Sequence, residues 1–252
     1  MPVLAVIPAR LGSTRLPKKP LQLLAGEPLV VRVAEHVQAM AVADWVVVAT
    51  DAAEVAQVVL RAGFRALLTS RRHESGTDRV AEVASRAEFQ NCDVVLNIQG
   101  DEPFLPREAV TGALDRLGLG DEVGTAAVPL QAAAAADPGK VKVVTELSGR
   151  ALYFSRAPIP SVRNGGSAPG LVHWQHLGLY AFTREALFRW AALPPAPLEV
   201  VERLEQLRAL QHGMRIGVAR LDCPAPPGVD TPDDLREAEA YWHLTHEGRG
   251  AR

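Results

Sequence analysis

Residues 3–21 read VLAVIPARLGSTRLPKKPL, an apolar run that leads into a loop rich in cations. The apolar run Val3–Pro8 predicts a strand buried on both faces. The loop after it carries four cationic side chains and the hydroxyl of Ser13; the cations are Arg10, Arg15, Lys18 and Lys19. Any one of these cations could be an ordinary surface residue, but four together at a strand end would repel one another without a counter-charge. The segment therefore predicts a binding site for a polyanion, and a triphosphate is the ligand that best explains it.

Strands and helices are predicted to alternate through the first hundred residues. Apolar runs predict further strands at Trp45–Ala49, Arg65–Leu68 and Asp93–Ile98. Helical spacing of apolar residues predicts helices at Leu29–Met40, Glu54–Ala62 and Thr77–Ala87. This alternation is typical of a doubly wound α/β fold with a mostly parallel sheet. Polar residues follow the strands at Thr50-Asp51 and Gln99–Glu102, and ligands in such sheets bind at these strand ends.

A lobe of different character is predicted in the second half of the chain. Strand-like runs at Lys140–Thr145, Ala151–Ser155 and His173–Phe182 flank an irregular stretch at Pro158–Pro169 and follow a surface helical turn at Ala132–Ala136. We expect an inserted mixed β lobe at about 131–185. Beyond it the sequence predicts an amphipathic helix at Leu198–Leu210, a strand at Arg215–Ala219, a closing helix from Thr231 to about His243 and a disordered tail at 248–252.

Composition narrows the class of protein. The 252 residues are 48% hydrophobic, enough for a sizeable core in a single domain with a lobe. The net charge of -2 does not favour binding to nucleic acid or to an anionic membrane. The two cysteines, Cys92 and Cys223, are far apart and fit a reduced compartment rather than a disulfide or a metal site. Without a membrane-length apolar run or a signal pattern, we expect a cytoplasmic protein.

Two carboxylates stand where a metal ion could bind. Asp101 follows the strand predicted at Asp93–Ile98, and Asp230 precedes Thr231-Pro232. Mg²⁺ usually takes one or two protein carboxylates and completes its coordination with phosphate oxygens and water. Helix capping is the alternative role for both residues, and it is stronger for Asp230 because a helix start follows it. The opening loop has neither the GxxxxGK[ST] nor the GxGxxG pattern, so it is not a P-loop or a dinucleotide fingerprint.

Five segments in order along nearly the whole chain resemble the CMP-Kdo synthetases, cytidylyltransferases that activate 3-deoxy-D-manno-octulosonate (Kdo). They are IPARLGSTRLPKKPL (7–21), HESGTDR (73–79), NIQGDEP (97–103), ALYFSRAPIP (151–160) with HLGLY (176–180), and PLEVVERLEQLRAL (197–210) with GVDTPDDL (228–235). Together they are far more restrictive than any single motif. The resemblance implies a nucleotidyltransferase fold of the nucleotide-diphospho-sugar transferase type. In such a fold, we expect residues 1–130 mainly to bind the nucleotide, and the lobe to bind the sugar and to form the interface of a homodimer.

The resemblance also implies a reaction and a role for each matching residue. Such enzymes transfer CMP from CTP to the anomeric hydroxyl of Kdo and release pyrophosphate, for lipopolysaccharide biosynthesis. The implied nucleotide-binding residues are Arg10, Ser13, Arg15, Lys19, Ser75, Gly76, Thr77, Arg79 and Gln99. The implied Mg²⁺ ligands are Asp101 and Asp230, which act in catalysis with Lys19. The implied sugar-binding residues are Gln99, Arg156, His176, Tyr180, Glu205 and Gln206.

The chemistry of the sugar-binding residues is compatible with an acidic sugar. Arg156 offers a planar fork for a carboxylate. On the helix predicted at Leu198–Leu210, Glu205 and Gln206 share neighbouring turns with Glu202 and could both reach a pocket. For His176 the alternative is a core or interface histidine, and for Tyr180 it is ordinary strand packing.

The chain departs from the family pattern at two places, which leaves alternatives open. Position 18 is Lys where the family usually has Gly, and the stretch Ser161–Gln175 is shorter and richer in Gly and Ser. Because that stretch lies between the sugar-lobe motifs, the alternative is a cytidylyltransferase for another acidic sugar, such as 8-amino-Kdo or a sialic-acid-like sugar. A catalytically silent nucleotide-binding protein on the same fold is the alternative of a different class.

Overall fold

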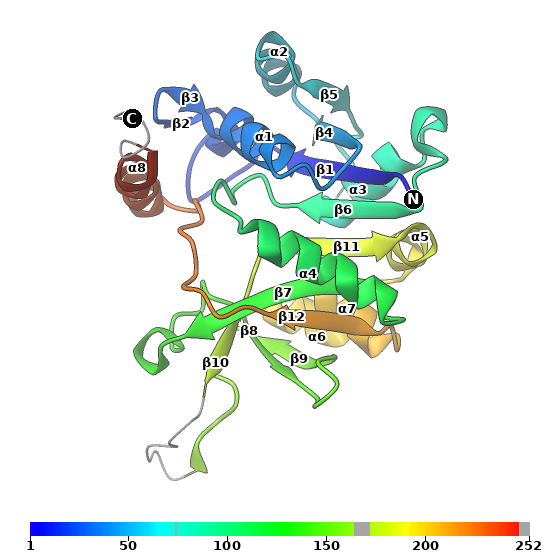
Figure 1. The fold of residues 1–252 in the computed structure, drawn as a ribbon, viewed down its shortest axis with the longest axis vertical. Helices are drawn as coiled ribbons and strands as arrows, with labels where there is room; N and C mark the ends of the chain where they lie inside the picture. The colour runs from blue at the N-terminus through cyan, green and yellow to red at the C-terminus, as the bar shows by residue number, and fades with distance from the viewer. Residues whose placement is uncertain (74, 164–171, 247–252) are drawn as a thin grey trace. The chain divides into compact units, whose positions relative to one another are not determined.

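The computed structural model describes residues 1–73, 75–163 and 172–246 (Figure 1). They fall into two compact units, one formed by Met1–Leu105 with Pro226–Arg252 and the other by Pro106–Ala225. The second unit extends beyond the lobe predicted at about 131–185 on both sides. The predicted tail at 248–252 and residues 164–171 of the short stretch lie outside the described residues.

The first unit contains a parallel sheet in the order β5-β4-β1-β6. In it, β1 (Val3–Ala9) lies between β4 (Trp45–Thr50) and β6 (Val94–Ile98), and β5 (Arg65–Leu68) pairs with β4. All of these pairings are parallel. The inner strands are continuous runs of buried Val, Leu, Ile and Ala, as expected for strands with both faces covered.

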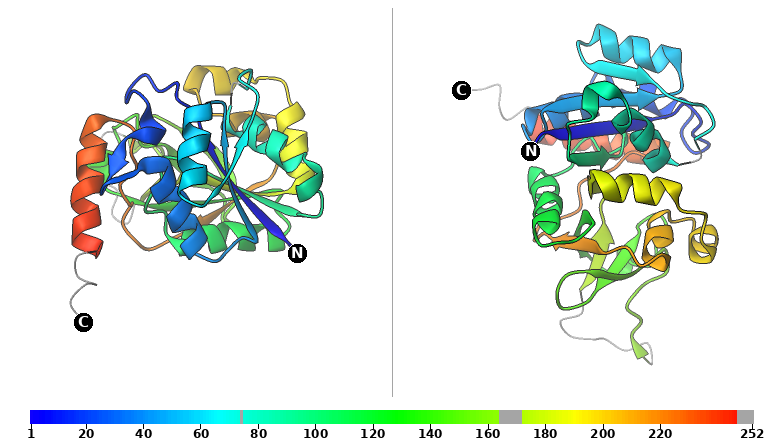
Figure 2. Two further views of the ribbon diagram at one scale, coloured as in Figure 1. Left: turned by 90° about the horizontal axis from the view of Figure 1, so that it is seen from above. Right: turned by 90° about the vertical axis from the view of Figure 1, so that its right-hand side faces the viewer.

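Helices cover this sheet, and the C-terminal helix also belongs to the first unit. α1 (Leu29–Ala39) and α2 (Ala53–Arg61) contact each other and β4, whereas α3 (Gly76–Ala84) contacts β1, β4 and β6. The closing helix α8 (Pro232–His246) packs on the hairpin of β2 (Leu23–Leu24) and β3 (Glu27–Pro28) (Figure 2). Short 3-10 helices occur at η1 (Lys19–Leu21) and η2 (Ala87–Phe89).

The second unit is built around one long strand, β7 (Val123–Leu130). β7 pairs antiparallel with β10 (His173–His176) and β11 (Leu179–Thr183), and parallel with β12 (Ile216–Arg220). β8 (Lys142–Thr145) continues the sheet from β10, and β9 (Ala151–Ser155) pairs with β8. This unit therefore has the mixed strand directions that the sequence predicts for the lobe.

Four helices pack around this mixed sheet. α4 (Arg107–Gly118) lies on β7, β11 and β12, α5 (Arg184–Ala192) lies on β11, and α7 (Gln206–Gln211) contacts β9 and the short α6 (Pro197–Glu202). α4 approaches β7 so closely that a β-carbon at Gly124 would lie 1.8 Å from the carbonyl oxygen of Ala113. Glycine at 124 therefore sets the spacing of helix and strand. A 3-10 turn, η3 (Ala132–Ala134), matches the predicted surface turn.

Several predicted elements differ from the observed ones. The predicted strand His173–Phe182 is two strands, because Leu177 and Gly178 interrupt it. The predicted helix Leu198–Leu210 is also wrong. It is two short helices, because Arg203 takes a left-handed conformation with φ 52°. The third helix begins at Gly76 and ends at Ala84 rather than running from Thr77 to Ala87. The sequence reasoning did not predict α4, β7 or α5.

Candidate active site

A cluster of opposite charges in the first unit joins the opening loop to the two predicted metal ligands. Nζ of Lys19 lies 2.5 Å from Oδ2 of Asp101 and 3.0 Å from Oδ1 of Asp230. Nη2 of Arg15 lies 3.0 Å from the same oxygen of Asp230. The structure therefore brings together four of the predicted site residues that are far apart in the sequence.

The backbone around Asp101 places the two carboxylates side by side. Asp101 follows β6 after Gly100, where a β-carbon would lie 2.9 Å from the carbonyl oxygen of Pro8 in β1. The absence of a side chain at 100 lets the end of β6 approach β1 this closely. The carbonyl of Asp101 then accepts a hydrogen bond from the N–H of Val229 at 2.9 Å. That bond ties the segment before Asp230 to Asp101.

Helix capping, the alternative role for both aspartates, is not what their side chains do. The N–H of Asp234 donates to Oγ1 of Thr231, and Oδ2 of Asp234 accepts from the N–H groups of Asp230 and Thr231. Thr231 and Asp234 therefore close the start of α8, and the Asp230 carboxylate faces Lys19 and Arg15 instead. After Asp101 no helix begins until Arg107, with Pro106 at the N-cap.

The ammonium of Lys19 is charged although its side chain is largely shielded from solvent. Burial by itself lowers the pKa of the Lys19 amine, but the carboxylates of Asp101 and Asp230 outweigh this effect and raise the pKa above its ordinary value. Its side chain is 18% exposed, against 59% for Arg15. The cation is therefore fixed at neutral pH between the two acids.

The donor set fits a magnesium ion. Each aspartate keeps a second oxygen, Oδ1 of Asp101 and Oδ2 of Asp230, that is not the one bonded to Lys19. Two carboxylates with adjacent cations are what a Mg²⁺–phosphate complex requires, since phosphate oxygens and water supply the other ligands. Within residues 1–73, 75–163 and 172–246, no group of three or more His, Cys, Asp or Glu side chains gathers in the manner of an all-protein metal site.

The rest of the opening loop is less constrained. Arg10 is exposed, and Oγ of Ser13 accepts a hydrogen bond from the N–H of Leu16 that closes a turn. Lys18 adopts a left-handed conformation with φ 51° just before η1, and its ammonium lies 3.4 Å from Glu54. Glycine is the residue that adopts this conformation without strain. A glycine at position 18, which the resemblance leads us to expect, would therefore have a conformational reason.

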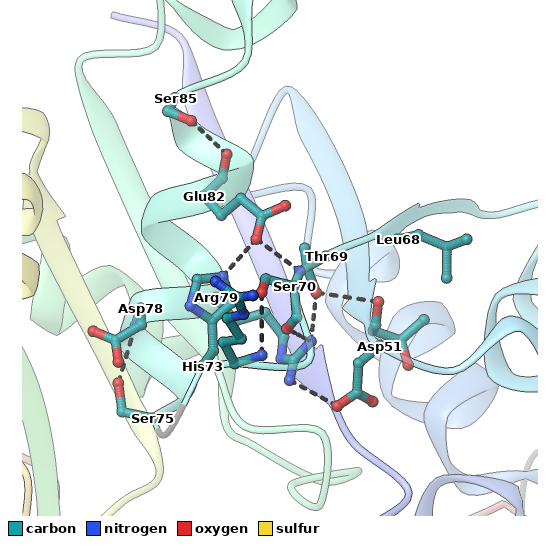
Figure 3. A network of polar contacts seen from close by, with 12 residues as sticks. Asp51, Leu68, Thr69, Ser70, His73, Ser75, Asp78, Arg79, Glu82 and Ser85 are labelled. Carbon is teal, nitrogen blue, oxygen red and sulfur yellow. Dashed lines mark hydrogen bonds and ion pairs between the residues drawn. The ribbon is translucent and has the colours of Figure 1, made fainter.

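The HESGTDR segment forms a polar network around the start of α3 (Figure 3). Ser75 is the N-cap of α3, because its Oγ accepts from the N–H of Asp78 at 3.0 Å. The Arg79 guanidinium is buried, donates to Oγ1 of Thr69 and lies 3.1 Å from Asp51. Thr77 is buried as well, with Nδ2 of Asn97 3.5 Å from its Oγ1, whereas Gly76 is half-buried against Pro8. Glu74 of this motif lies outside the described residues.

A carboxylate in the same network fixes the loop that precedes α3. Glu82 accepts hydrogen bonds from the N–H of Ser70 and from Nε2 of His73 (Figure 3). Burial alone raises the pKa of the Glu82 carboxyl, but these hydrogen bonds and the charges of His73 and Arg86 outweigh it and lower the pKa. In this structure, therefore, Glu82 and Arg79 both hold the loop that precedes α3, Glu82 through Ser70 and His73 and Arg79 through Thr69.

In the second unit, three of the predicted sugar-binding residues form a polar and aromatic cluster with Trp190, namely His176, Tyr180 and Glu205. The ring centroids of His176 and Tyr180 are 5.3 Å apart, and those of Tyr180 and Trp190 are 5.6 Å apart. Nε1 of Trp190 donates to Oε1 of Glu205 at 3.1 Å. Gln206 is buried at the first position of α7, next to Glu205. Gln99 belongs to the first unit, at the end of β6, and is half-buried.

Burial in this cluster keeps both ring side chains neutral. The pKa of His176 is lowered to about 3 by burial. Burial raises the pKa of the Tyr180 phenol well above its ordinary value, and the charge of Glu205 raises it further. The cluster can therefore offer neutral hydrogen-bonding groups, which suit sugar hydroxyls.

Arg156 is held by backbone carbonyls at the break between α6 and α7. Its Nε donates to the carbonyl of Glu202 at 2.8 Å, Nη1 to that of Pro138 at 2.8 Å and Nη2 to that of Arg203 at 3.3 Å. A guanidinium has five N–H groups, so two remain for a carboxylate.

Glu202, which the sequence reasoning used only for helix spacing, is the hub of this region. Its carboxylate accepts from Oγ of Ser155 at 2.6 Å, from the N–H of Arg156 at 3.0 Å and from the phenol of Tyr153 at 3.4 Å. Since the helix is broken at Arg203, Glu202 does not share neighbouring turns of one helix with Glu205 and Gln206, and that expectation is wrong.

Comparisons with known proteins decide the family. A family model described as "Cytidylyltransferase" matches residues 4–216. A protein of Gemmatimonas aurantiaca named 3-deoxy-manno-octulosonate cytidylyltransferase is 53% identical over 249 residues, which is 98% of this chain and 96% of that protein. The chain belongs to the 3-deoxy-manno-octulosonate cytidylyltransferase family.

Further relatives agree with this membership. A 3-deoxy-manno-octulosonate cytidylyltransferase of Polynucleobacter necessarius is 47% identical over 235 residues, 92% of each chain. A solved structure of CMP:2-keto-3-deoxy-manno-octonic acid synthetase complexed with CTP has a TM-score of 0.88 and 39% identity, covering 97% of this chain and 100% of the other. This match confirms the predicted nucleotidyltransferase-type α/β fold. A cytidylyltransferase of Leptospira borgpetersenii, at a TM-score of 0.61 and 15% identity over 97% of this chain and 87% of the other, shares the fold.

Membership of this family means that the chain is an enzyme, a nucleotidyltransferase. The family membership confirms the resemblance drawn from the five sequence segments.

Among the described residues, no helix has the length and apolar content needed to cross a bilayer.

Proposed function

We propose that this protein transfers CMP from CTP to the anomeric hydroxyl of Kdo, giving CMP-Kdo and pyrophosphate. The observation that carries the proposal is the 53% identity, over 98% of the chain, to a protein named for this activity. The charge cluster of Lys19, Asp101 and Asp230 supports it, because a triphosphate substrate needs cations and a metal site together. No observation favours a different acidic sugar or a silent protein.

The chemistry we propose needs no covalent enzyme intermediate. The sugar hydroxyl oxygen bonds to the α-phosphorus and its proton is released to solvent. The bond from that phosphorus to the bridging oxygen breaks, and pyrophosphate leaves with the electron pair. Lys19 and Arg15 would neutralise the phosphate oxygens, so the chain contributes charge and position. Asp101 and Asp230 would hold Mg²⁺, which when bound neutralises phosphate charge and makes the attacking hydroxyl more acidic.

Each remaining role that we propose rests on the chemistry of the side chain. Arg10 and Ser13 would contact the triphosphate, and Ser75, Gly76, Thr77, Arg79 and Gln99 would border the nucleotide. The two N–H groups of Arg156 not bonded to carbonyls would bind the sugar carboxylate. His176, Tyr180, Glu205, Gln206 and Gln99 would hydrogen-bond the sugar hydroxyls.

We further propose a cytoplasmic homodimer that serves lipopolysaccharide biosynthesis. Cys92 and Cys223 are not joined in a disulfide, as expected in a reducing compartment. Exposed apolar side chains on α6 and β9, with Val201 80% and Leu152 61% exposed, are compatible with a second copy as partner.

The direct test is pyrophosphate release from CTP and Kdo. The purified protein with Mg²⁺ should release one pyrophosphate per CMP-Kdo formed, and EDTA should abolish the reaction. Parallel reactions with ATP, GTP and UTP test base selectivity, and reactions with 8-amino-Kdo and a sialic acid test the sugar. Turnover with another acidic sugar but not with Kdo would select the alternative enzyme. CTP binding without turnover on any sugar would select the silent protein.

A further inference from the structure

A threonine that no sequence motif singles out contacts one of the proposed sugar-binding residues. Thr125 lies in β7 and is fully buried. Its Oγ1 lies 2.9 Å from Nε2 of His176 and 2.7 Å from the carbonyl oxygen of Leu179. The one hydroxyl thus joins the last residue of β10 to the first residue of β11.

The strand register explains how Thr125 reaches both residues. Ala127 of β7 stands opposite His176 of β10, and Gly124 stands opposite Ala181 of β11, so Thr125 lies where β7 changes partner. Side chains two apart on a strand share a face, so Thr125 and Ala127 point to the same side as His176. Around the break, Leu177 donates its N–H to Ala126 and Leu179 donates to Leu177, which fixes the position of the Leu179 carbonyl.

Hydrogen counting determines which way the bond to His176 runs. A carbonyl oxygen can only accept, so the single hydroxyl hydrogen of Thr125 is donated to Leu179. Towards His176 the Thr125 oxygen can therefore only accept, and Nε2 must carry a hydrogen. The ring is neutral, since packing against Phe154, with ring centroids 5.1 Å apart, and against Tyr180 shields one side of the half-exposed imidazole from water and lowers its pKa. A neutral imidazole has one N–H, so Nδ1 presents a lone pair.

We infer that Thr125 is a positioning residue that fixes His176 in the tautomer protonated at Nε2, so that Nδ1 accepts a hydrogen bond from a hydroxyl of the sugar. The part concerning the sugar rests on the proposed function. None of the described residues bonds to Nδ1, and His176 is only half-buried, so this nitrogen is open to a donor. The selectivity that follows is for a hydroxyl that donates, since a lone pair cannot pair with an acceptor.

The tautomer is measured in the wild-type protein, without any substitution. Long-range ¹H–¹⁵N spectra distinguish a protonated from an unprotonated ring nitrogen, and loss of signals in His176→Asn assigns them. We expect Nε2 protonated and Nδ1 unprotonated at neutral pH. A ring protonated at Nδ1 would overturn the inference, whatever reaction the enzyme catalyses.

The positioning role is measured with Thr125→Val and Thr125→Ser. Valine keeps the shape but removes the acceptor, and we expect the KM for Kdo to rise about tenfold, as for one lost hydrogen bond. The KM for CTP should not change, and the serine variant should restore both the KM for Kdo and the tautomer. Thr183→Val is the matched control, because within the described residues the Thr183 hydroxyl bonds only to the N–H of Ala186 at the start of α5, and its loss lowers stability without altering the KM for Kdo.

Each result has a defined meaning. An unchanged KM for Kdo in folded Thr125→Val would overturn the positioning role. If Thr125→Val does not fold, Thr125→Ser and the wild-type tautomer decide. Wild-type protein that shows the Nε2 tautomer but no turnover with Kdo would contradict the proposed function and the sugar contact, and would leave the effect of Thr125 on His176 established.

Discussion

The Lys19 ammonium lies 2.5 Å from Oδ2 of Asp101, although the two residues are 82 positions apart in the chain. Asp230 meets the same ammonium from 211 positions away. A cation and two acids from three distant segments therefore form one charge cluster. The cluster can be tested by removing each charge in turn.

Asp101→Asn and Asp230→Asn should each lower kcat at saturating Mg²⁺ by about 100-fold or more, as expected when a preorganised charge at the reacting centre is lost. Asparagine keeps the shape and removes the charge. Turnover is measured as pyrophosphate release over a Mg²⁺ titration. Asp233→Asn is the control, since its side chain is 80% exposed and, within the part of the chain that the structure describes, pairs only with Arg236 on the surface of α8. Near-normal turnover of Asp101→Asn would contradict its role as a metal ligand.

The contribution of Lys19 to stability should disappear at high pH. Burial lowers the pKa of Lys19, but Asp101 and Asp230 outweigh burial, so the pKa in the folded protein is above the ordinary value of 10.5. The group then stabilises the fold below 10.5 and loses this contribution as pH rises through the folded pKa.

The measurement is denaturant unfolding of the wild type and Lys19→Met between neutral pH and strongly alkaline pH. The difference in unfolding free energy should be constant below 10.5 and shrink above it. Lys140→Met is the control, because the described residues contain no ion pair to Lys140, and its difference should stay flat. A difference for Lys19→Met that grows with pH would have the wrong sign for a raised pKa.

Lys18→Gly should stabilise the protein by about 1 kcal/mol, because glycine relieves a left-handed residue. The ion pair of Lys18 with Glu54 contributes little, since the two side chains are 64% and 45% exposed. Thermal unfolding should show a midpoint raised by about 2 °C. Lys18→Ala is the matched control, because it also removes this ion pair but keeps a β-carbon. Equal midpoints for the two variants would show that the backbone conformation carries no strain.

Gly124→Ala should destabilise the second unit by about 3 kcal/mol through overpacking. The new methyl would lie 1.8 Å from the backbone oxygen of Ala113, which cannot move without shifting α4 from β7. Gly118→Ala is the control, since nothing lies within 4 Å of its position and alanine favours the helix. Both variants are compared by urea unfolding. Equal stability of the two would mean that α4 and β7 are not in close contact.

The buried parallel strands could be predicted because they are continuous apolar runs, a pattern that indicates a strand without any knowledge of tertiary contacts. β1, β4 and β6 are runs of Val, Ile and Leu, and the predicted β5 has the observed bounds Arg65–Leu68. β7 could not be predicted in the same way. Its sequence VGTAAVPL has Gly124 inside it and Pro129 near its end, both poor strand residues. It is a strand because β10, β11 and β12 pair with it.

Tertiary contacts also decide the break between α6 and α7. The spacing from Leu198 to Leu210 is that of one amphipathic helix, and Arg203 is not a residue that favours the left-handed conformation. The hydrogen bonds from Arg156 to the Glu202 and Arg203 carbonyls stabilise the break, and they come from a residue 46 and 47 positions away. No local pattern contains that information.

The candidate site was predictable in its residue types but not in its contacts. Asp101 and Asp230 could be paired by their settings at segment ends, whereas the ammonium of Lys19 between them follows only from the fold. Thr125 carries no motif signal, because its role depends on a partner in each of two neighbouring strands. The capping role of Ser75 did have a signal, since Asp78 stands three residues later in a capping-box pattern.

Arg156 is already ordered by three carbonyls of the protein, and this has a thermodynamic consequence. A free arginine side chain loses about 2 kcal/mol of rotamer entropy when it is immobilised. For Arg156 this rotamer entropy is lost when the protein folds, so it is not lost again when the sugar binds. An acidic sugar that binds the two remaining N–H groups would therefore keep nearly all of the charge-assisted hydrogen-bond energy as affinity.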